Sequence, residues 1–324
     1  MEDSWNNKRK KMLGSMIARF AGPYELCLWP LSECRQQAIR ARSVQNSRVL
    51  DLLSDRGHVI MPRLEFRKSA PPRLVFEEIG RHQATTFTGL CAEHDQLLFR
   101  PIDVPSLDPN DSRQLFLLAY RSLLREVHAA RKTAIDHQAG YQEGVAQGLY
   151  PDDTPCAPGL LAIEHGMAAF LVEEVKERYD EAYATGNWAA LEHHLILLDV
   201  GPVLAVSSVF STDLWAESTD APAFVAVNVV PIERHTVAIF SYLREQRLQM
   251  IEAFERVWAS TGDLQTYELS KLLLRKCENI ALAPRHFQSL GPQQRETIRE
   301  YFERNTCGHG YECEDPNLNI FRPA

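Results

Sequence analysis

The stretch Leu90-Cys91-Ala92-Glu93-His94-Asp95 decides how this chain is interpreted, together with an earlier pair of cysteines, Cys27 and Cys34. Cysteine and histidine are soft or borderline metal ligands, and here they occur in two close pairs about sixty residues apart. A tetrahedral zinc ion takes four such ligands and closes the loop between the two pairs. The spacing therefore predicts one structural zinc ion bound by Cys27, Cys34, Cys91 and His94.

The residues between and after the ligand pairs predict the local structure around this zinc. Val59-Ile60-Met61 and Leu74-Val75-Phe76 flank a polar loop with Pro71-Pro72, a pattern typical of a hairpin with a long tip. An amphipathic run beginning at Asp95 predicts a helix that opens at the second ligand pair. Residues 24–103 are thus expected to form a small head, which needs the metal because so short a segment builds little core.

The order knuckle, strand, hairpin, knuckle, helix resembles the HNH-type (treble-clef, ββα-metal) endonuclease superfamily over this head. The resemblance implies phosphodiester hydrolysis by a general base and a second divalent cation, magnesium or manganese. By order along the chain, the base position falls on Arg42, the cation position on Asp95 and the supporting loop group on Asn46. A guanidinium stays protonated near neutral pH, so His58 and His82, on either side of the hairpin, are candidate replacements for the base. Both also fit the description of ordinary surface histidines.

Charge is distributed unevenly along the 324 residues. The net charge is -8, but residues 1–103 hold 16 Lys/Arg against 12 Asp/Glu, and the remainder holds 19 against 31. A polyanion would therefore contact the head, where basic side chains that share one face could follow a phosphate backbone. The predicted contacts are Arg40, Arg48, Arg67 and Lys68. A solvated hairpin explains the same residues without nucleic acid.

The whole chain is predicted to be α+β, with a basic helix over 1–23, the head over 24–103 and a body over 104–324. Pro101, Pro105 and Pro109 suggest a linker before the body. In the body we expect a first long helix over about 112–138, with Asp111 or Ser112 as its N-cap. Further helices are expected over about 160–183, 242–259, 264–281 and 292–304. We also expect two antiparallel strand pairs, 194–198 with 203–210 across Gly201-Pro202, and 223–230 with 236–240.

The cysteine pattern and the hydropathy of the chain bear on the cellular compartment of the protein. Seven cysteines form no regular framework, and the first residues lack the apolar region of a signal peptide. The most apolar window is interrupted by Asp199 and Gly201-Pro202, so no membrane span is expected and a cytoplasmic protein is predicted. Near the C-terminus, Cys307, His309 and Cys313 leave two alternatives open: a second metal site, or a tail loop with free thiols.

Two functions follow from these patterns. The first is a zinc-binding HNH-like protein that acts on or binds nucleic acid, such as a nuclease component of phage defence or of a mobile element. The alternative is a non-enzymatic scaffold or sensor, in which zinc only staples the head. In both, the acidic body binds a protein partner or forms a homo-oligomer.

Overall fold

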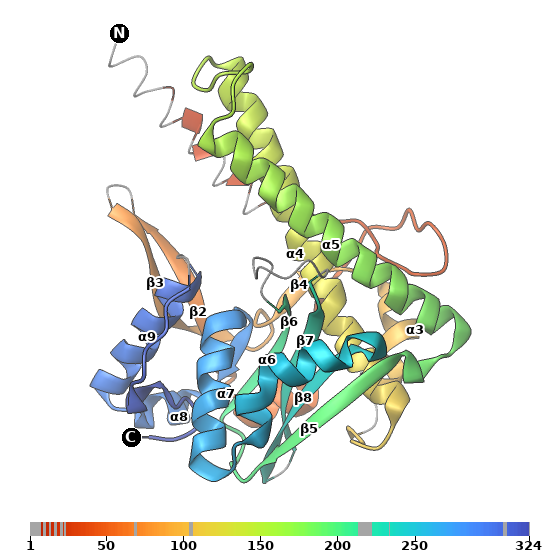
Figure 1. Ribbon diagram of the computed structural model, residues 1–324, viewed down its shortest axis with the longest axis vertical. Coiled ribbons are helices and arrows are strands. Elements are labelled where there is room, and N and C mark those ends of the chain that lie inside the picture. Colours follow the sequence, from red (N-terminus) through yellow and green to blue (C-terminus); the bar gives the residue numbers. More distant parts are fainter. Residues whose placement is uncertain are drawn as a thin grey trace. The chain divides into compact units, whose positions relative to one another are not determined.

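In the computed structural model, the described residues are 24–323 apart from 68–69, 104–105, 213–221, 233 and 307–309, together with residues 8, 11, 12, 14, 15, 18, 19 and 22. Long helices and an extended antiparallel sheet make up the chain, so the α+β fold class is confirmed (Figure 1). Within the predicted basic helix over 1–23, the described residues between Lys8 and Arg19 are helical.

The chain forms two compact units, each made of segments that are distant in sequence. The helical unit contains residues 1–41, 87–96 and 123–186, and the sheet unit contains residues 42–86, 97–122 and 187–324. Their edges do not coincide with the predicted boundaries after residues 23 and 103. The chain crosses from one unit to the other inside helix α3 (Ala92–Asp103) and again inside helix α4 (Ser112–Ala146). Continuous helices therefore make these crossings, and Pro101, assigned to the linker, lies within α3.

The sheet unit is built on a seven-stranded sheet with the order β3-β2-β9-β6-β7-β8-β5, and its neighbouring strands pair antiparallel. The strands are β2 (His58–Arg67), β3 (Ala70–Gly80), β5 (Leu191–Leu198), β6 (Leu204–Ser211), β7 (Phe224–Ile232), β8 (His235–Leu243) and β9 (Ile280–Leu282).

Alternation along these strands gives the sheet two buried faces. Val225, Val227 and Val229 of β7 belong to the larger core, because residues two apart point to the same side of a strand. Ala205 of β6 and Ala281 of β9 point to the opposite face and pack in a smaller core. A sheet covered on both faces explains why these strands read as nearly continuous apolar runs.

Helices cover the larger core. Met250 and Phe254 of α6 and Leu269 and Leu273 of α7 pack against it, and Figure 1 shows these two helices lying across one face of the sheet. The helices of this face are α6 (Arg247–Ala259), α7 (Gly262–Lys276), α8 (Pro284–Ser289) and α9 (Pro292–Thr306), with short 3-10 turns at Arg244–Gln246 and Pro316–Leu318. The smaller core is closed by a π-helical turn, η1 (Asn46–Leu50), and by α2 (Asp51–Leu53).

Buried polar side chains tie the start of α4 to the sheet. The Ser122 hydroxyl lies 2.8 Å from the Ser207 hydroxyl and donates to Asn228 Oδ1 at 2.9 Å. Asn279 Nδ2 donates to Ser43 Oγ and to the Ser207 carbonyl, both at 2.8 Å. Buried polar groups need such partners, so this network fixes how these segments pack inside the sheet unit.

The helical unit contains the second part of α4 and the whole of α5 (Ala157–Thr185), which run side by side (Figure 1). Arg131 of α4 pairs with Glu173 of α5 at 2.6 Å. α5 is followed by Gly186, whose φ of 68° lies in the left-handed region that favours glycine. A two-stranded sheet of β1 (Arg40–Arg42) and β4 (Thr86–Thr88) precedes α3.

Three predicted elements are placed differently. The hairpin assigned to the head exists as β2–β3, but it pairs through β9 with the large sheet and so belongs to the sheet unit. The predicted pairing of 194–198 with 203–210 is wrong, because β5 pairs with β8 at the sheet edge. The predicted helix 264–281 ends at Lys276, and Ile280–Leu282 forms strand β9. The pair 223–230 and 236–240 is confirmed as the hairpin β7–β8.

Candidate metal centre

Four side chains of the helical unit converge on one point: Cys27, Cys34, Cys91 and His94. Their ligand atoms all lie within 4.8 Å of one another. His94 Nδ1 is 3.4 Å from Cys27 Sγ and 3.3 Å from Cys91 Sγ, and the sulfurs of Cys34 and Cys91 are 4.0 Å apart. The two ligand pairs predicted from sequence are therefore brought together.

These separations fit a tetrahedral zinc ion. Zn–S bonds of about 2.3 Å and Zn–N bonds of about 2.0–2.1 Å place neighbouring sulfurs about 3.8 Å apart and a sulfur about 3.5 Å from a nitrogen. The observed S–S distance of 4.0 Å and S–N distances of 3.3 and 3.4 Å lie close to these values. Three thiolates and one imidazole also form a donor set typical of structural zinc, in which every coordination position is filled by protein.

Local structure explains how the chain presents these ligands. Cys91 directly precedes α3 and His94 lies in its first turn, so the two side chains share one face at the helix N-terminus. The loop with Cys27 and Cys34 is held beside them by two backbone bonds, from Leu28 N to the Gly89 carbonyl and from Ile39 N to the Leu90 carbonyl, each 2.8 Å. The positive end of the α3 dipole also favours thiolate charge at this place.

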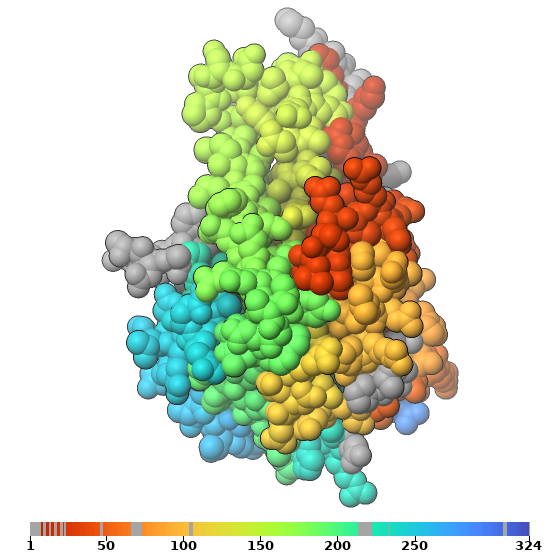
Figure 2. Space-filling model, turned by 90° about the vertical axis from the view of Figure 1, so that its right-hand side faces the viewer, coloured from red at the N-terminus to blue at the C-terminus, as the bar shows by residue number. Residues whose placement is uncertain are grey.

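A second layer of contacts orients the ligands. The indole of Trp29 stacks on the His94 ring, with centroids 4.2 Å apart and planes 4° apart. Trp29 in turn makes an edge contact with Tyr183 of α5, and Figure 2 shows the red N-terminal surface lying against the green surface of that helix. The Cys91 backbone N–H donates to Cys27 Sγ at 3.3 Å, and the Trp29 backbone N–H donates to the same sulfur.

Burial opposes ionisation of one ligand. Loss of solvation raises the pKa of the Cys27 thiol to about 11, although the two backbone N–H donors act in the opposite direction. A zinc ion reverses this balance because it stabilises the thiolate directly, and its binding then releases protons. The cluster is thus suited to hold a cation and poorly suited to hold a reactive free thiolate.

The predicted base position is occupied by Arg42, whose side chain makes a structural hydrogen bond to the backbone. Arg42 ends β1, and its guanidinium donates to the His82 carbonyl at 3.0 Å, while its Nε is buried with no hydrogen-bond partner among the described residues. Asp95 lies in the first turn of α3, in the helical unit, whereas Arg42 belongs to the sheet unit.

The candidate replacement histidines lie at one end of the β2–β3 hairpin. His58 opens β2 and is exposed, with Nδ1 3.1 Å from the Arg56 carbonyl. His82 follows β3 and is also exposed, and it meets Arg42 through its backbone. Arg42 thus contacts the His82 backbone carbonyl and not its imidazole, so this contact does not bring the His82 ring to the predicted base position.

The remaining predicted residues are only partly described. Arg40 and Arg48 are exposed, and Arg48 donates to Ser106 Oγ at 2.7 Å. Asn46 starts the η1 turn and Arg67 ends β2, but their side chains lie outside the described structure, as do Lys68, Cys307 and His309. Cys313 lies within the described structure; its side chain is half-buried and packs against the larger core.

Sequence reasoning did not identify Trp29 as part of the metal centre. Its position two residues after Cys27 was the available signal, since an aromatic ring beside a knuckle can cover a ligand.

Comparisons with protein families, with curated proteins and with solved structures give no match to this chain. Within the described residues, no helix has the length and apolar character needed to cross a bilayer.

Proposed function

We propose that this chain is a zinc-stapled, HNH-like protein that binds nucleic acid and does not hydrolyse it. The observation that carries the proposal is the convergence of four zinc ligands, two from a loop and two from the N-terminal turn of a helix. Strands β1 and β4 pair with each other, and β4 leads directly into this helix. A paired ββ element followed by a ligand-bearing helix is what the resemblance to HNH-type nucleases implies.

The absence of hydrolysis is inferred from the chemistry of the base position. Arg42 is committed to the His82 carbonyl, and a guanidinium cannot take a proton from water at neutral pH. A zinc site closed by three sulfur ligands and one nitrogen ligand offers no position for a catalytic water, so any hydrolysis would depend on a second cation and on a base near it. Zinc in this proposal holds the N-terminal loop against the start of α3, so that the exposed Arg40 on β1 is presented at a fixed place for phosphate contact.

The experiment combines metal content with binding. Purified protein should contain one zinc per chain and should bind short duplex DNA or RNA with an affinity that falls as salt rises, because phosphate contacts release counterions. Arg40→Gln should weaken binding and reduce the salt slope by about one, and Arg285→Gln, an exposed arginine of α8, is the control. Binding that is absent at low salt, or indifferent to salt, would contradict the nucleic-acid role.

A second candidate, assembly without nucleic acid, is favoured by one observation on α5. Leu160, Ile163, Met167 and Phe170 are between 57% and 63% exposed, and they follow the 3–4–3 spacing of a coiled-coil seam. Exposed apolar surface of this kind commonly marks a protein interface. Met167→Glu tests it by light scattering: conversion of an oligomer to a monomer would support assembly through this face, and an unchanged mass would contradict it.

A further inference from the structure

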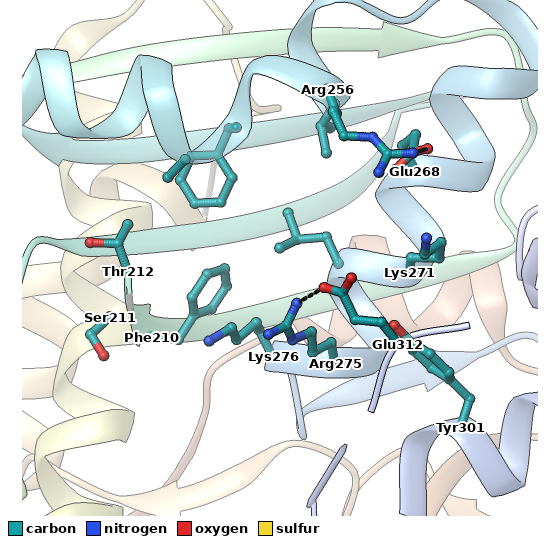
Figure 3. Close-up of a pocket in the computed structure, with 14 residues that line it drawn as sticks. Phe210, Ser211, Thr212, Arg256, Glu268, Lys271, Arg275, Lys276, Tyr301 and Glu312 are labelled. Carbon is teal, nitrogen blue, oxygen red and sulfur yellow. Dashed lines mark hydrogen bonds and ion pairs between the residues drawn. The ribbon is translucent and has the colours of Figure 1, made fainter. Parts of the chain in front are cut away.

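A cavity of about 220 Å³ lies in the sheet unit. It is bordered by the end of β6, by α6 and α7, and by the C-terminal segment around Glu312 (Figure 3). One part of its lining is apolar, with Phe210, Phe254 and Val257. Another part is basic, formed by side chains of α6 and α7. The basic lining residues are Arg256, Lys271, Arg275 and Lys276.

The acids that meet these cations come largely from the exposed C-terminal segment. Arg275 pairs with Glu312, as the dashed line in Figure 3 shows, and Lys271 Nζ pairs with Glu314 at 2.6 Å. The two glutamate side chains are 67% and 65% exposed, whereas those of Arg275 and Lys271 are 31% and 9% exposed. The two cations thus lie on helix α7 and are more buried, whereas the carboxylates that pair with them are largely exposed to solvent.

We propose that this cavity binds a small organic phosphomonoester, and that the Glu312 carboxylate occupies the place of its phosphate. With Glu312 displaced, the described lining side chains carry four positive charges and one negative charge, that of Glu268, which is paired with Arg256 at 2.7 Å. Counting Glu314 as well, which pairs with Lys271 from outside the lining, gives a net charge of +2 for these described residues. Such a balance suits a dianion. The planar fork of Arg275 matches two phosphate oxygens, and Ser211 is also among the lining residues.

The volume and the apolar wall limit the rest of the ligand. Ligand sites commonly have volumes of about 300–1,000 Å³, and an apolar cavity of about 150 Å³ accommodates benzene. A cavity of about 220 Å³ therefore takes one ring or short chain together with one phosphate group. The ring would lie against Phe210 and Phe254, and the phosphate would lie at Arg275 and Lys276.

Isothermal titration calorimetry with phenyl phosphate at pH 7.5 and low salt tests the assignment, with inorganic phosphate and phenol as separate ligands. We expect saturable binding of phenyl phosphate that is at least ten-fold tighter than that of either fragment. Arg275→Gln and Lys276→Gln should each weaken it about ten-fold or more. Glu312→Gln should tighten it several-fold, because the competing carboxylate is removed. Arg285→Gln, whose side chain is 85% exposed, should leave it unchanged.

The proposal is overturned if neither the natural protein nor Glu312→Gln binds phenyl phosphate saturably. It is also overturned if Glu312→Gln weakens binding, or if inorganic phosphate binds as tightly as phenyl phosphate. Circular dichroism melting of each variant separates loss of the site from loss of the fold, and two independent cation variants keep the test decisive if one of them is unstable.

Discussion

The indole ring of Trp29 lies parallel to the imidazole ring of His94, with 4.2 Å between centroids and 4° between planes. Parallel stacking fixes the imidazole plane, and His94 Nδ1 points at the sulfurs of Cys27 and Cys91. A ligand held in its binding orientation before the metal arrives loses less conformational freedom on binding. Trp29 is therefore placed to orient one side chain of the candidate metal centre.

Replacing Trp29 tests that role. Trp29→Ala should lower zinc affinity about ten-fold, at the low end of the roughly 10–100-fold range for residues that orient metal ligands. Trp29→Phe keeps a ring over His94 and should recover most of the affinity. Competition with a chromophoric chelator measures both. Equal affinities for the natural protein and Trp29→Ala would show that the stacking does not position the ligand.

Removal of one ligand should destabilise the helical unit selectively. Cys34→Ser leaves three ligands, and zinc should fall well below one per chain because a structural site needs all four. Hydrogen exchange should then accelerate in residues 24–41 and 87–91, while β6–β8 remain protected. Cys156→Ser, at the residue before α5, is the matched control and should keep its zinc. Unchanged protection around residues 24–41 after zinc loss would argue against a structural role.

The predicted base position, Arg42, allows a gain-of-function test. The natural protein should show no magnesium- or manganese-dependent cleavage of plasmid DNA, because Arg42 cannot act as a base. Arg42→His should introduce nicking if Asp95 holds the second cation, and general-base assistance is typically worth about 10²–10⁴-fold. Arg42→Gln is the control that removes the guanidinium without adding a base. Strong cleavage by the natural protein that survives Asp95→Asn would place any active centre elsewhere.

A partly buried histidine of the sheet unit predicts acid sensitivity. Burial lowers the pKa of His193 on β5 from 6.5 to about 4; its Nδ1 lies 2.8 Å from the Ser241 hydroxyl, and its Nε2 has no hydrogen-bond partner in the described part of the chain. The unfolded state binds this proton below about pH 6.5 and the folded state only near pH 4. The free energy of unfolding should therefore fall as pH drops through this window, by at most about 1.4 kcal/mol per pH unit from this residue.

Urea denaturation between about pH 7 and pH 4.5 measures that slope. His193→Gln removes the titrating group and should flatten the slope without abolishing it. Burial also lowers the pKa values of His128, His194 and His286, so these residues contribute in the same direction. An identical slope for His193→Gln and the natural protein would mean that the pKa of His193 is the same in the folded and unfolded states.

Local chemistry explains which elements could be predicted from sequence. Asp111 is a typical N-cap residue by its position, and its Oδ1 accepts the backbone N–H groups of Arg113 and Gln114 at 2.9 and 3.2 Å. Because an N-cap involves only residues that are close in sequence, the start of this helix can be predicted from the local sequence. The cluster of Cys27, Cys34, Cys91 and His94 is predictable for a similar reason, since Cys and His in close pairs are uncommon without a chemical role.

Elements that depend on distant partners were mispredicted. Ile280–Leu282 continues the apolar spacing of α7, yet β9 is held between β2 and β6, which no local pattern reveals. Gly201-Pro202 resembles a hairpin turn, but every residue of β5 pairs with one on β8 instead. The cations of the cavity were missed because Lys271 and Arg275 are four residues apart on α7, a spacing equally typical of a solvated helix face.

The central claim is that Cys27, Cys34, Cys91 and His94 bind one zinc ion as a closed set. X-ray absorption at the zinc edge, on protein whose metal content has been quantified, tests it most directly. We predict one zinc per chain with three sulfurs at about 2.3 Å and one nitrogen at about 2.0–2.1 Å. Protein without stoichiometric zinc, or a zinc shell dominated by oxygen and nitrogen, would contradict the account.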